Sequence, residues 1–294
     1  MKIQCSSAEL SKACMNVQRT VSNKSTIPAL EGILLDAKDG IVSLTGYDLE
    51  VGSIAKVPAE ISSEGRIVLG AKNLCDILRM IPGDTVSIDC DERNISKIKS
   101  EETEYSLIGT SADDYPDLPT ISKYTSITLE LGTLKDMIKK TIFSVSTSER
   151  NPVHTGVKFE ISGGKIVLVA VDGARLAIRR EEINFIYESE ENADKNLEFV
   201  VPAKTLNEIL KLSGDDDTQI VIYVGDRHII FKYREYEIMG QELKAILTQA
   251  RQQGRDEAAA AAAPKEKLTC PWCGATTIPD ANGCCEYCGG SFND

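Results

Sequence analysis

The chain has 294 residues, of which 42% are hydrophobic and 27% charged, which is the composition of a globular protein with room for about two domains. Its formal net charge of −12, from 33 basic and 45 acidic residues, argues against a protein that coats nucleic acid with its whole surface, although it leaves room for a local basic surface. The polar start and the short apolar runs show neither a secretory signal nor a membrane span, so we expect a cytoplasmic protein that contacts no membrane.

A first set of elements is predicted in the first 110 residues. Apolar residues recur at helical spacing over 7–20 and again over 72–80, where Pro82-Gly83 stops the second helix. Alternating apolar residues on both sides of Asp39-Gly40 predict a hairpin between these helices. Three further strands are predicted near 85–90, 94–99 and 104–109.

The same order of elements is predicted a second time. A segment at 113–126, with two prolines and several acidic residues, has no periodicity and is expected to be a linker. Helices are predicted over 133–144 and 204–212, and a hairpin over 159–171 lies between them. The remaining strands of this set are predicted near 219–224, 227–233 and 235–239.

Two pairs of sequence stretches indicate that these sets are copies. GILLDAKDGIVSLTGYDLEVG at 32–52 aligns with GVKFEISGGKIVLVAVDGARL at 156–176, at an offset of 124. AKNLCDIL at 71–78 likewise aligns with AKTLNEIL at 203–210, at an offset of 132. Because a repeated order of helices and strands reflects repeated structural units, the chain is expected to be an α+β protein. Its two like domains are predicted at 1–124 and 125–240.

The predicted helices are basic although the chain is acidic. Two cations lie seven residues apart in three of the helices and four apart in the other, so each pair shares a helix face. These pairs are Lys12 and Arg19, Lys72 and Arg79, Lys135 and Lys139, and Lys204 and Lys211. This pattern predicts one basic surface that contacts nucleic-acid phosphates without reading base sequence. A duplication that merely builds a stable two-domain protein is the alternative explanation of the repeat.

Six long stretches together resemble the bacterial sliding clamp, the beta subunit of DNA polymerase III. They are STIPALEGILLDAKDGIVSLTGYDLEVG (25–52), GAKNLCDIL (70–78), SADDYPDLP (111–119), SVSTSERNPVHTGVKFE (144–160), VAVDGARLAI (169–178) and VPAKTLNEIL (201–210). The resemblance implies a ring of like domains, with helices lining the bore and antiparallel sheets on the other face. It further implies that double-stranded DNA passes through the ring and that the clamp tethers DNA polymerase III during DNA replication, as a processivity factor that also meets the clamp loader.

The resemblance also assigns residues, position by position. Lys24 and Arg150 fall in loops that contact DNA in the family, although Asn151 replaces an arginine of the usual pattern. Lys72 and Lys204 fall at positions that face the bore. Together with the charged helix faces, the expected DNA-binding residues are Lys12, Arg19, Lys24, Lys72, Arg79, Lys139, Arg150 and Lys204. The partner-peptide pocket of the family corresponds to Val171, Gly173, Ala174, Arg175 and Leu176.

The chain departs from the family pattern after residue 238. The family has three such domains, whereas two are recognised here, and residues 239–263 predict one polar helix within a linker at 241–266. Ring closure therefore has alternatives: a homo-oligomeric ring of three two-domain chains, or a clamp that does not close. In the second case the protein would be a clamp-derived scaffold that recruits partners through its tail.

The tail carries different chemistry. CPWC at 270–273 and CEYC at 285–288 are two Cys-x-x-Cys pairs, 11 residues apart, each followed by a glycine. Four thiolates at such spacing are typical of a tetrahedral Zn²⁺ site, which predicts a zinc ribbon at 267–294. The expected ligands are Cys270, Cys273, Cys285 and Cys288, with Cys284 as an alternative to Cys285 and a redox pair as the alternative chemistry.

No catalytic motif is present in the sequence. It contains no P-loop, no GxGxxG and no HExxH pattern, and four cysteine ligands leave zinc no open position for water. The three acidic residues at 215–217 are expected to form a solvated turn. We therefore expect a non-catalytic accessory protein.

Overall fold

A computed structural model describes most of the first 244 residues and short pieces of the tail. The described residues are 1–22, 24–148, 150–183, 186–187, 196–213, 217–244, 268–269, 271–277, 284, 287–288 and 291. The chain divides into two compact units, Met1–Leu247 and Thr248–Asp294. Within the described residues, no helix is long and apolar enough to cross a bilayer.

The first domain packs two helices, α1 (Ser7–Val17) and α2 (Ala71–Met80), against antiparallel strands. Ser6 caps α1 by accepting a hydrogen bond from the backbone N–H of Glu9, and the chain leaves the helical conformation at Ile81, just before Pro82. The strands are β1 (Lys2–Ser6), β2 (Gly32–Lys38), β3 (Ile41–Tyr47), β4 (Val51–Ser63), β5 (Gly65–Gly70), β6 (Thr85–Cys90), β7 (Ile95–Ser100) and β8 (Thr103–Ile108). Leu10, Cys14 and Leu74 are fully buried between the helices and these strands.

The second domain repeats this plan with α3 (Leu131–Lys139) and α4 (Ala203–Leu210). Its strands are β9 (Tyr124–Glu130), β10 (Gly156–Ser162), β11 (Lys165–Val171), β12 (Leu176–Glu182), β13 (Ile186–Tyr187), β14 (Leu197–Pro202), β15 (Gln219–Gly225), β16 (His228–Tyr233) and β17 (Tyr236–Gln241). Its core is mostly aliphatic and includes a stacked pair of aromatic rings, Phe159 and Phe199, whose centroids are 5.1 Å apart. The predicted α+β repeat is confirmed.

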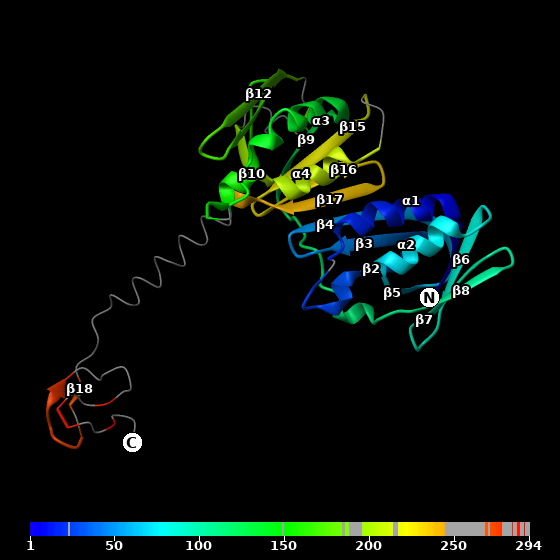
Figure 1. The fold of residues 1–294 in the computed structure, drawn as a ribbon, viewed down its shortest axis with the longest axis horizontal. Coiled ribbons are helices and arrows are strands. Elements are labelled where there is room, and N and C mark those ends of the chain that lie inside the picture. The colour runs from blue at the N-terminus through cyan, green and yellow to red at the C-terminus, as the bar shows by residue number, and fades with distance from the viewer. Residues whose placement is uncertain are drawn as a thin grey trace. The chain divides into compact units, whose positions relative to one another are not determined.

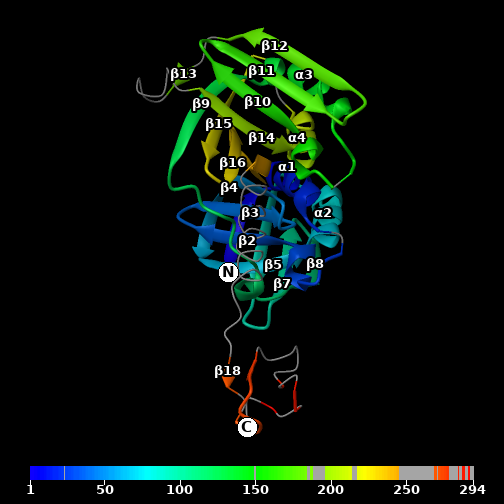
Figure 2. The same ribbon diagram turned by 90° about the vertical axis from the view of Figure 1, so that its left-hand side faces the viewer.

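A continuous sheet joins the two domains. β17 pairs antiparallel with β4, with Tyr236 opposite Ala55 and Gly240 opposite Val51. The resulting sheet has 13 strands and runs from the second domain into the first. Figure 1 shows β17 lying beside β4, and Figure 2 shows all four helices on one side of this unit, with β9, β15, β16 and β4 on the other. The predicted layering of helices on one face and sheets on the other is therefore present.

Three predicted boundaries differ from the structure. The predicted linker at 113–126 overlaps β9, which begins at Tyr124 and pairs with β15. The predicted polar helix from residue 239 was wrong for its first three residues, which form the end of β17. Glu242 and Leu243 are also buried, and the Glu242 carboxylate accepts a hydrogen bond from the Val200 N–H, so the second domain continues past residue 240. Pairing with β16, and for Met239 and Gly240 also with β4, holds these residues in a strand that their own sequence pattern does not predict.

The second unit is described only in pieces. β18 (Leu268–Thr269) pairs antiparallel with β19 (Thr276–Thr277), so Cys273 lies in the turn of a hairpin. Cys284 forms an isolated bridge with Ser291, and the Trp272 indole N–H donates to the Ser291 carbonyl oxygen at 3.2 Å. Of the acidic turn predicted at 215–217, only Asp217 is within the described residues.

Candidate nucleic-acid interface

The first domain presents cations on the outer face of its helices. α1 buries Leu10, Cys14 and Val17, which leaves Lys12 exposed on the opposite face and Arg19 exposed just beyond the helix end. Among the described residues neither of these two cations has an ion-pair partner. Their charges are therefore available to an anion in solution.

In α2 the two predicted cations differ. Lys72 is exposed and has no ion-pair partner in the part of the chain that the structure describes. Arg79 is also exposed, but its guanidinium lies 3.5 Å from the Asp76 carboxylate, one helical turn away. The Asp76 carboxylate offsets part of the Arg79 charge, so Arg79 is a weaker source of positive charge than Lys72. Because an exposed pair of this kind is weak, Arg79 can still exchange it for a phosphate.

The third helix carries one cation without a partner. Lys139 is exposed and, within the described ranges, makes no ion pair. Lys135 donates a hydrogen bond to the Leu212 carbonyl oxygen, and Lys140 pairs with Asp136 at 2.7 Å. The predicted cation pair on α3 is therefore divided: Lys139 faces solvent and Lys135 contributes to packing.

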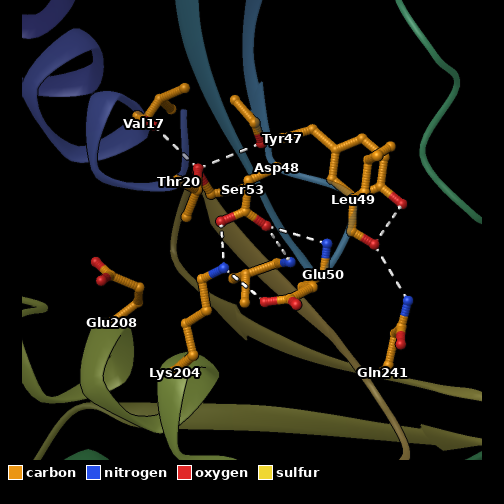
Figure 3. Close-up of polar contacts among 12 residues, drawn as sticks. Val17, Thr20, Tyr47, Asp48, Leu49, Glu50, Ser53, Lys204, Glu208 and Gln241 are labelled. Carbon is orange, nitrogen blue, oxygen red and sulfur yellow. Dashed lines mark hydrogen bonds and ion pairs between the residues drawn. The ribbon is translucent and has the colours of Figure 1, made fainter. Parts of the chain in front are cut away.

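The fourth helix differs from the other three because its cations are neutralised. Lys211, just beyond α4, lies 2.7 Å from Glu208. The Lys204 ammonium lies 2.8 Å from the Asp48 carboxylate and 2.6 Å from that of Glu50, both of which belong to the first domain. Figure 3 shows Lys204 reaching from α4 to the turn that joins β3 to β4. Lys204 thus crosses the junction between the domains.

Asp48 is held in place independently of Lys204. One carboxylate oxygen accepts hydrogen bonds from the backbone N–H groups of Glu50, at 3.0 Å, and Val51, at 2.8 Å, while the other receives Lys204. Burial acts to lower the pKa of Lys204, but the hydrogen bonds and negative charges of Asp48 and Glu50 outweigh it, so the pKa is raised. Lys204 is therefore firmly protonated, and two carboxylates compete with phosphate for it.

Other contacts also join the domains at this junction. The Gln241 side chain donates to the Leu49 carbonyl oxygen at 3.1 Å, as Figure 3 shows. The Arg19 guanidinium lies 3.4 Å from the Lys211 carbonyl oxygen. Sequence reasoning missed this role for the turn at Asp48. The available signal was the alignment of Asp48 with Asp172, which marks the same tight turn in both copies.

The two predicted loop cations are both exposed. Lys24 precedes a short 3-10 helix, Pro28–Glu31, and Arg150 precedes the corresponding one, Pro152–Thr155. Among the described residues neither cation has an ion-pair partner, and Arg150 is held only by its backbone N–H, 3.5 Å from the Ser148 hydroxyl. Both loops thus carry a cation that is open to solvent.

The predicted partner-peptide residues form an exposed turn. The Asp172 carboxylate accepts hydrogen bonds from the backbone N–H groups of Ala174 and Arg175, each at 3.0 Å, and pairs with the Arg175 guanidinium at 2.7 Å. Gly173 has a φ of +91°, where a side chain would be strained. Next to it, Val171 ends β11 half-buried, and Leu176 begins β12 with 60% of its surface exposed. The turn therefore displays an apolar side chain on a rigid backbone.

The predicted metal ligands are only partly described. Cys270 and Cys285 lie outside the described residues, whereas Cys273 and Cys288 are exposed in turns. Gly274 has a φ of +71°, as a tight turn after the first pair requires. Within the described part of the chain, no three Cys, His, Asp or Glu side chains gather closely enough to hold a metal ion. The zinc site stays a prediction.

Two family models match the chain in sequence. The N-terminal domain of the DNA polymerase III beta subunit matches residues 1–119, and the central domain matches residues 128–245. The beta sliding clamp of Bacillus subtilis is 32% identical over 240 residues, which are 79% of this chain and 62% of that protein. The beta sliding clamp of one Staphylococcus epidermidis strain is 33% identical over 222 residues, or 73% of this chain and 57% of that protein.

The fold matches as well as the sequence. The crystal structure of the DNA polymerase sliding clamp from Bacillus subtilis superimposes with a TM-score of 0.77 at 30% identity, over 83% of this chain and 64% of that one. The chain thus spans about three-fifths of the length of the relatives that it matches. With matches to both domain models, in order and over four-fifths of its residues, the chain belongs to the DNA polymerase III beta subunit family, the bacterial sliding clamps.

Proposed function

We propose that this protein is a DNA sliding clamp, a processivity factor that holds DNA polymerase III on duplex DNA during replication. The observation that supports it most is the position of the cations that have no ion-pair partner among the described residues. Lys12, Lys72 and Lys139 come from three helices that share one side of the first unit, although the chain as a whole is acidic. Action on the bacterial chromosome would place the protein in the cytoplasm.

The character of this surface suits sliding. Lysines on helices contact phosphates as point charges and read no base edges, so neighbouring positions along the duplex are nearly equal in energy. Retention then depends on topology, while electrostatic attraction only keeps the DNA near the helices. The expected DNA contacts are Lys12, Arg19, Lys24, Lys72, Lys139 and Arg150, with smaller contributions from Arg79 and Lys204 because carboxylates lie beside them.

Retention on circular and linear DNA tests this function. The protein is loaded onto a nicked circular plasmid with a clamp loader, and the fraction retained through gel filtration is measured before and after a restriction enzyme linearises the DNA. A clamp stays on the circle and is lost from the free ends. Equal retention on both forms would instead support the alternative of a non-encircling scaffold that binds DNA and recruits partners.

Partner binding is proposed for the turn at Asp172. Gly173, Ala174 and Arg175 are exposed beside Leu176, and the hydrogen bonds of Asp172 hold them rigid. A rigid, partly apolar turn suits docking of a peptide from the polymerase or the clamp loader, because little conformational entropy is lost on binding. Leu176→Glu is expected to weaken binding of such a peptide, measured by fluorescence polarisation, without loss of thermal stability.

Zinc binding by the tail is a separate proposal. Cys270, Cys273, Cys285 and Cys288 would hold Zn²⁺ as thiolates, and metal binding would contribute folding energy of order 10–16 kcal/mol to a segment too short for a core. The hairpin of β18 and β19 and the left-handed Gly274 suit a knuckle around the first cysteine pair. Mass spectrometry of the intact native protein should find about one zinc per chain, reduced in Cys273→Ser; a metal-free wild-type chain would refute the site.

A further inference from the structure

Among the strands that lie at sheet edges, β8 and β12 each pair with one neighbouring strand only. β8 ends the 13-stranded sheet, and β12 ends the 4-stranded sheet of the second domain. Figure 1 and Figure 2 both show β8 and β12 at opposite ends of the first unit. An exposed edge is a template for pairing with another chain, so these edges are candidates for assembly.

The β4–β17 pair inside the chain provides a geometric template for pairing of these edges. β4 and β12 are equivalent in the repeat, because Tyr47 pairs with Gly52 in one hairpin and Val171 with Leu176 in the other. β17 and β8 are equivalent as well, because their hairpins begin at the pairs Tyr233–Tyr236 and Ser100–Thr103. The internal β4–β17 pair therefore has a geometric counterpart in the two open edges.

Transferring the internal register to the open edges predicts specific neighbours. Glu237 lies opposite Ile54 and Met239 opposite Gly52 in the internal pair. At the open edges, the same register places Glu104 opposite Ile178 and Ser106 opposite Leu176. The large–small combination of Met239 with Gly52 thus becomes a small–large one, Ser106 with Leu176. Side-chain volume remains complementary even though the residues differ.

The charges repeat in the same way. In the internal junction, Glu237 lies 3.6 Å from Lys56 of β4 and 3.9 Å from Lys232 of β16. The counterpart of Glu237 is Glu104, which already lies 2.8 Å from Lys99, the counterpart of Lys232. The counterpart of Lys56 is Arg180, an exposed cation for which the described residues offer no ion-pair partner. A glutamate on β8 and one cation on β7 therefore form half of a two-cation site, and the second cation is on β12.

Apolar side chains also gather at these edges. On and beside β12, Leu176 is 60%, Ile178 41% and Phe143 59% exposed. On and beside β8, Ile108 is 84% and Met80 67% exposed. These five are half of the ten large hydrophobic side chains that the described residues expose, and the counterpart of Met80, Leu212, is 7% exposed beside the internal junction. Pairing of the edges would remove this apolar surface from water.

We infer that β12 of one chain pairs antiparallel with β8 of a second copy of the same chain, with Arg180 of one copy beside Glu104 of the other. The contact is head-to-tail, so each copy offers one edge of each kind and the assembly can close into a ring. This inference deepens the proposed function, because it supplies ring closure from the two domains seen here.

Charge exchange tests the contact in the full chain without DNA. The mass of the wild-type protein, measured by sedimentation across a concentration series, is expected to rise above that of a single chain. Glu104→Arg and Arg180→Glu should each lower the association constant by about tenfold, since each places like charges at the contact. The double variant should regain most of the wild-type association, because it restores opposite charges. Glu60→Arg, the same charge change on an exposed residue of β4, should have no effect.

Cross-linking gives a second readout that does not depend on charge. A chain with both Ser106→Cys and Leu176→Cys should form covalent head-to-tail oligomers on mild oxidation, whereas either change alone should not. The inference is overturned if the wild-type protein has the mass of one chain at all concentrations. It is also overturned if neither charge variant weakens the assembly, or if the double cysteine chain forms no additional oligomers. Because DNA is absent, these results are independent of the plasmid experiment: a monomer that still encircles DNA refutes the contact alone.

Discussion

Lys72 and Lys204 occupy equivalent positions in the two copies, yet we expect their neutralisation to affect different properties of the protein. Lys72→Gln removes an exposed charge with no ion-pair partner among the described residues. Lys204→Gln removes a charge that two carboxylates already balance, at 2.8 Å from Asp48 and 2.6 Å from Glu50. The first change should therefore weaken DNA binding, and the second should weaken the junction between the domains.

The magnitudes follow from the surroundings of each lysine. One phosphate contact contributes about 0.9 to the slope of log K against log salt concentration, so Lys72→Gln should reduce that slope by about 0.9. The Lys204 side chain is half exposed, and an exposed ion pair contributes at most about 1 kcal/mol. With two carboxylates involved, we expect Lys204→Gln to lower the free energy of unfolding by about 1 kcal/mol. For a unit of this size that corresponds to a decrease in Tm of about 2–4 °C.

Two measurements on the same pair of variants distinguish these outcomes. Fluorescence anisotropy with a labelled duplex, repeated at several salt concentrations, gives the slope, and thermal unfolding monitored by circular dichroism gives Tm. Each variant is the control for the other, since both remove one lysine charge from the same position of a like helix. If Lys204→Gln reduced the salt slope as much as Lys72→Gln and left Tm unchanged, the assignment of Lys204 to the junction would be refuted.

Two further predictions concern the paired turns. Gly173→Ala should lower the free energy of unfolding of the second domain by about 1 kcal/mol, because φ is +91° there. Leu49 has a φ of +74°, so Leu49→Gly should lower the free energy of unfolding by less than the same change at a leucine with negative φ. Urea denaturation of both variants checks these expectations. The hydrogen bond from the Arg175 side chain, with a further one from the backbone N–H of Ala174, holds the pKa of Asp172 below its usual range. The stabilisation of the folded state by this carboxylate is therefore present above the ordinary aspartate pKa, and it is lost as the pH falls through the lowered value. Arg175→Ala should raise that pKa toward the ordinary value, which an NMR titration of the side chain would detect.

Much of the fold follows from local patterns. The helices α1, α2 and α4 and the hairpin of β10 and β11 were predictable, because each has a complete apolar period and a clear turn or breaker at its end. β17 was predicted too short because its last residues, Met239 to Gln241, are held by pairing with β16, and Met239 and Gly240 also with β4, rather than by their own pattern. Long-range pairing of this kind leaves no periodic signal in the strand itself.

The candidate site was predictable in its charges but not in their partners. Helical spacing placed Lys12, Lys72 and Lys139 on exposed faces without knowledge of the fold. The same spacing gave Lys204 an identical role, because its neutralisation depends on a turn more than 150 residues away in the chain. Pattern alone identifies which residues are charged, whereas the opposing charges that reach them depend on tertiary structure.

Duplication followed by divergence accounts for the different surroundings of Lys72 and Lys204. Each copy supplies one turn after its third strand, at Asp48 or Asp172, and each carries one lysine at the start of its second helix. Inside the chain, Glu50 adds a second carboxylate to the turn, which holds Lys204 and fixes the domains together. At the outer turn, Ala174 stands in the place of Glu50 and Arg175 occupies the Asp172 carboxylate, so a lysine brought there would find no uncompensated negative charge. An outer contact with the register of the inner one would therefore rest on strand pairing and on Arg180 with Glu104, and it would leave Lys72 available to DNA.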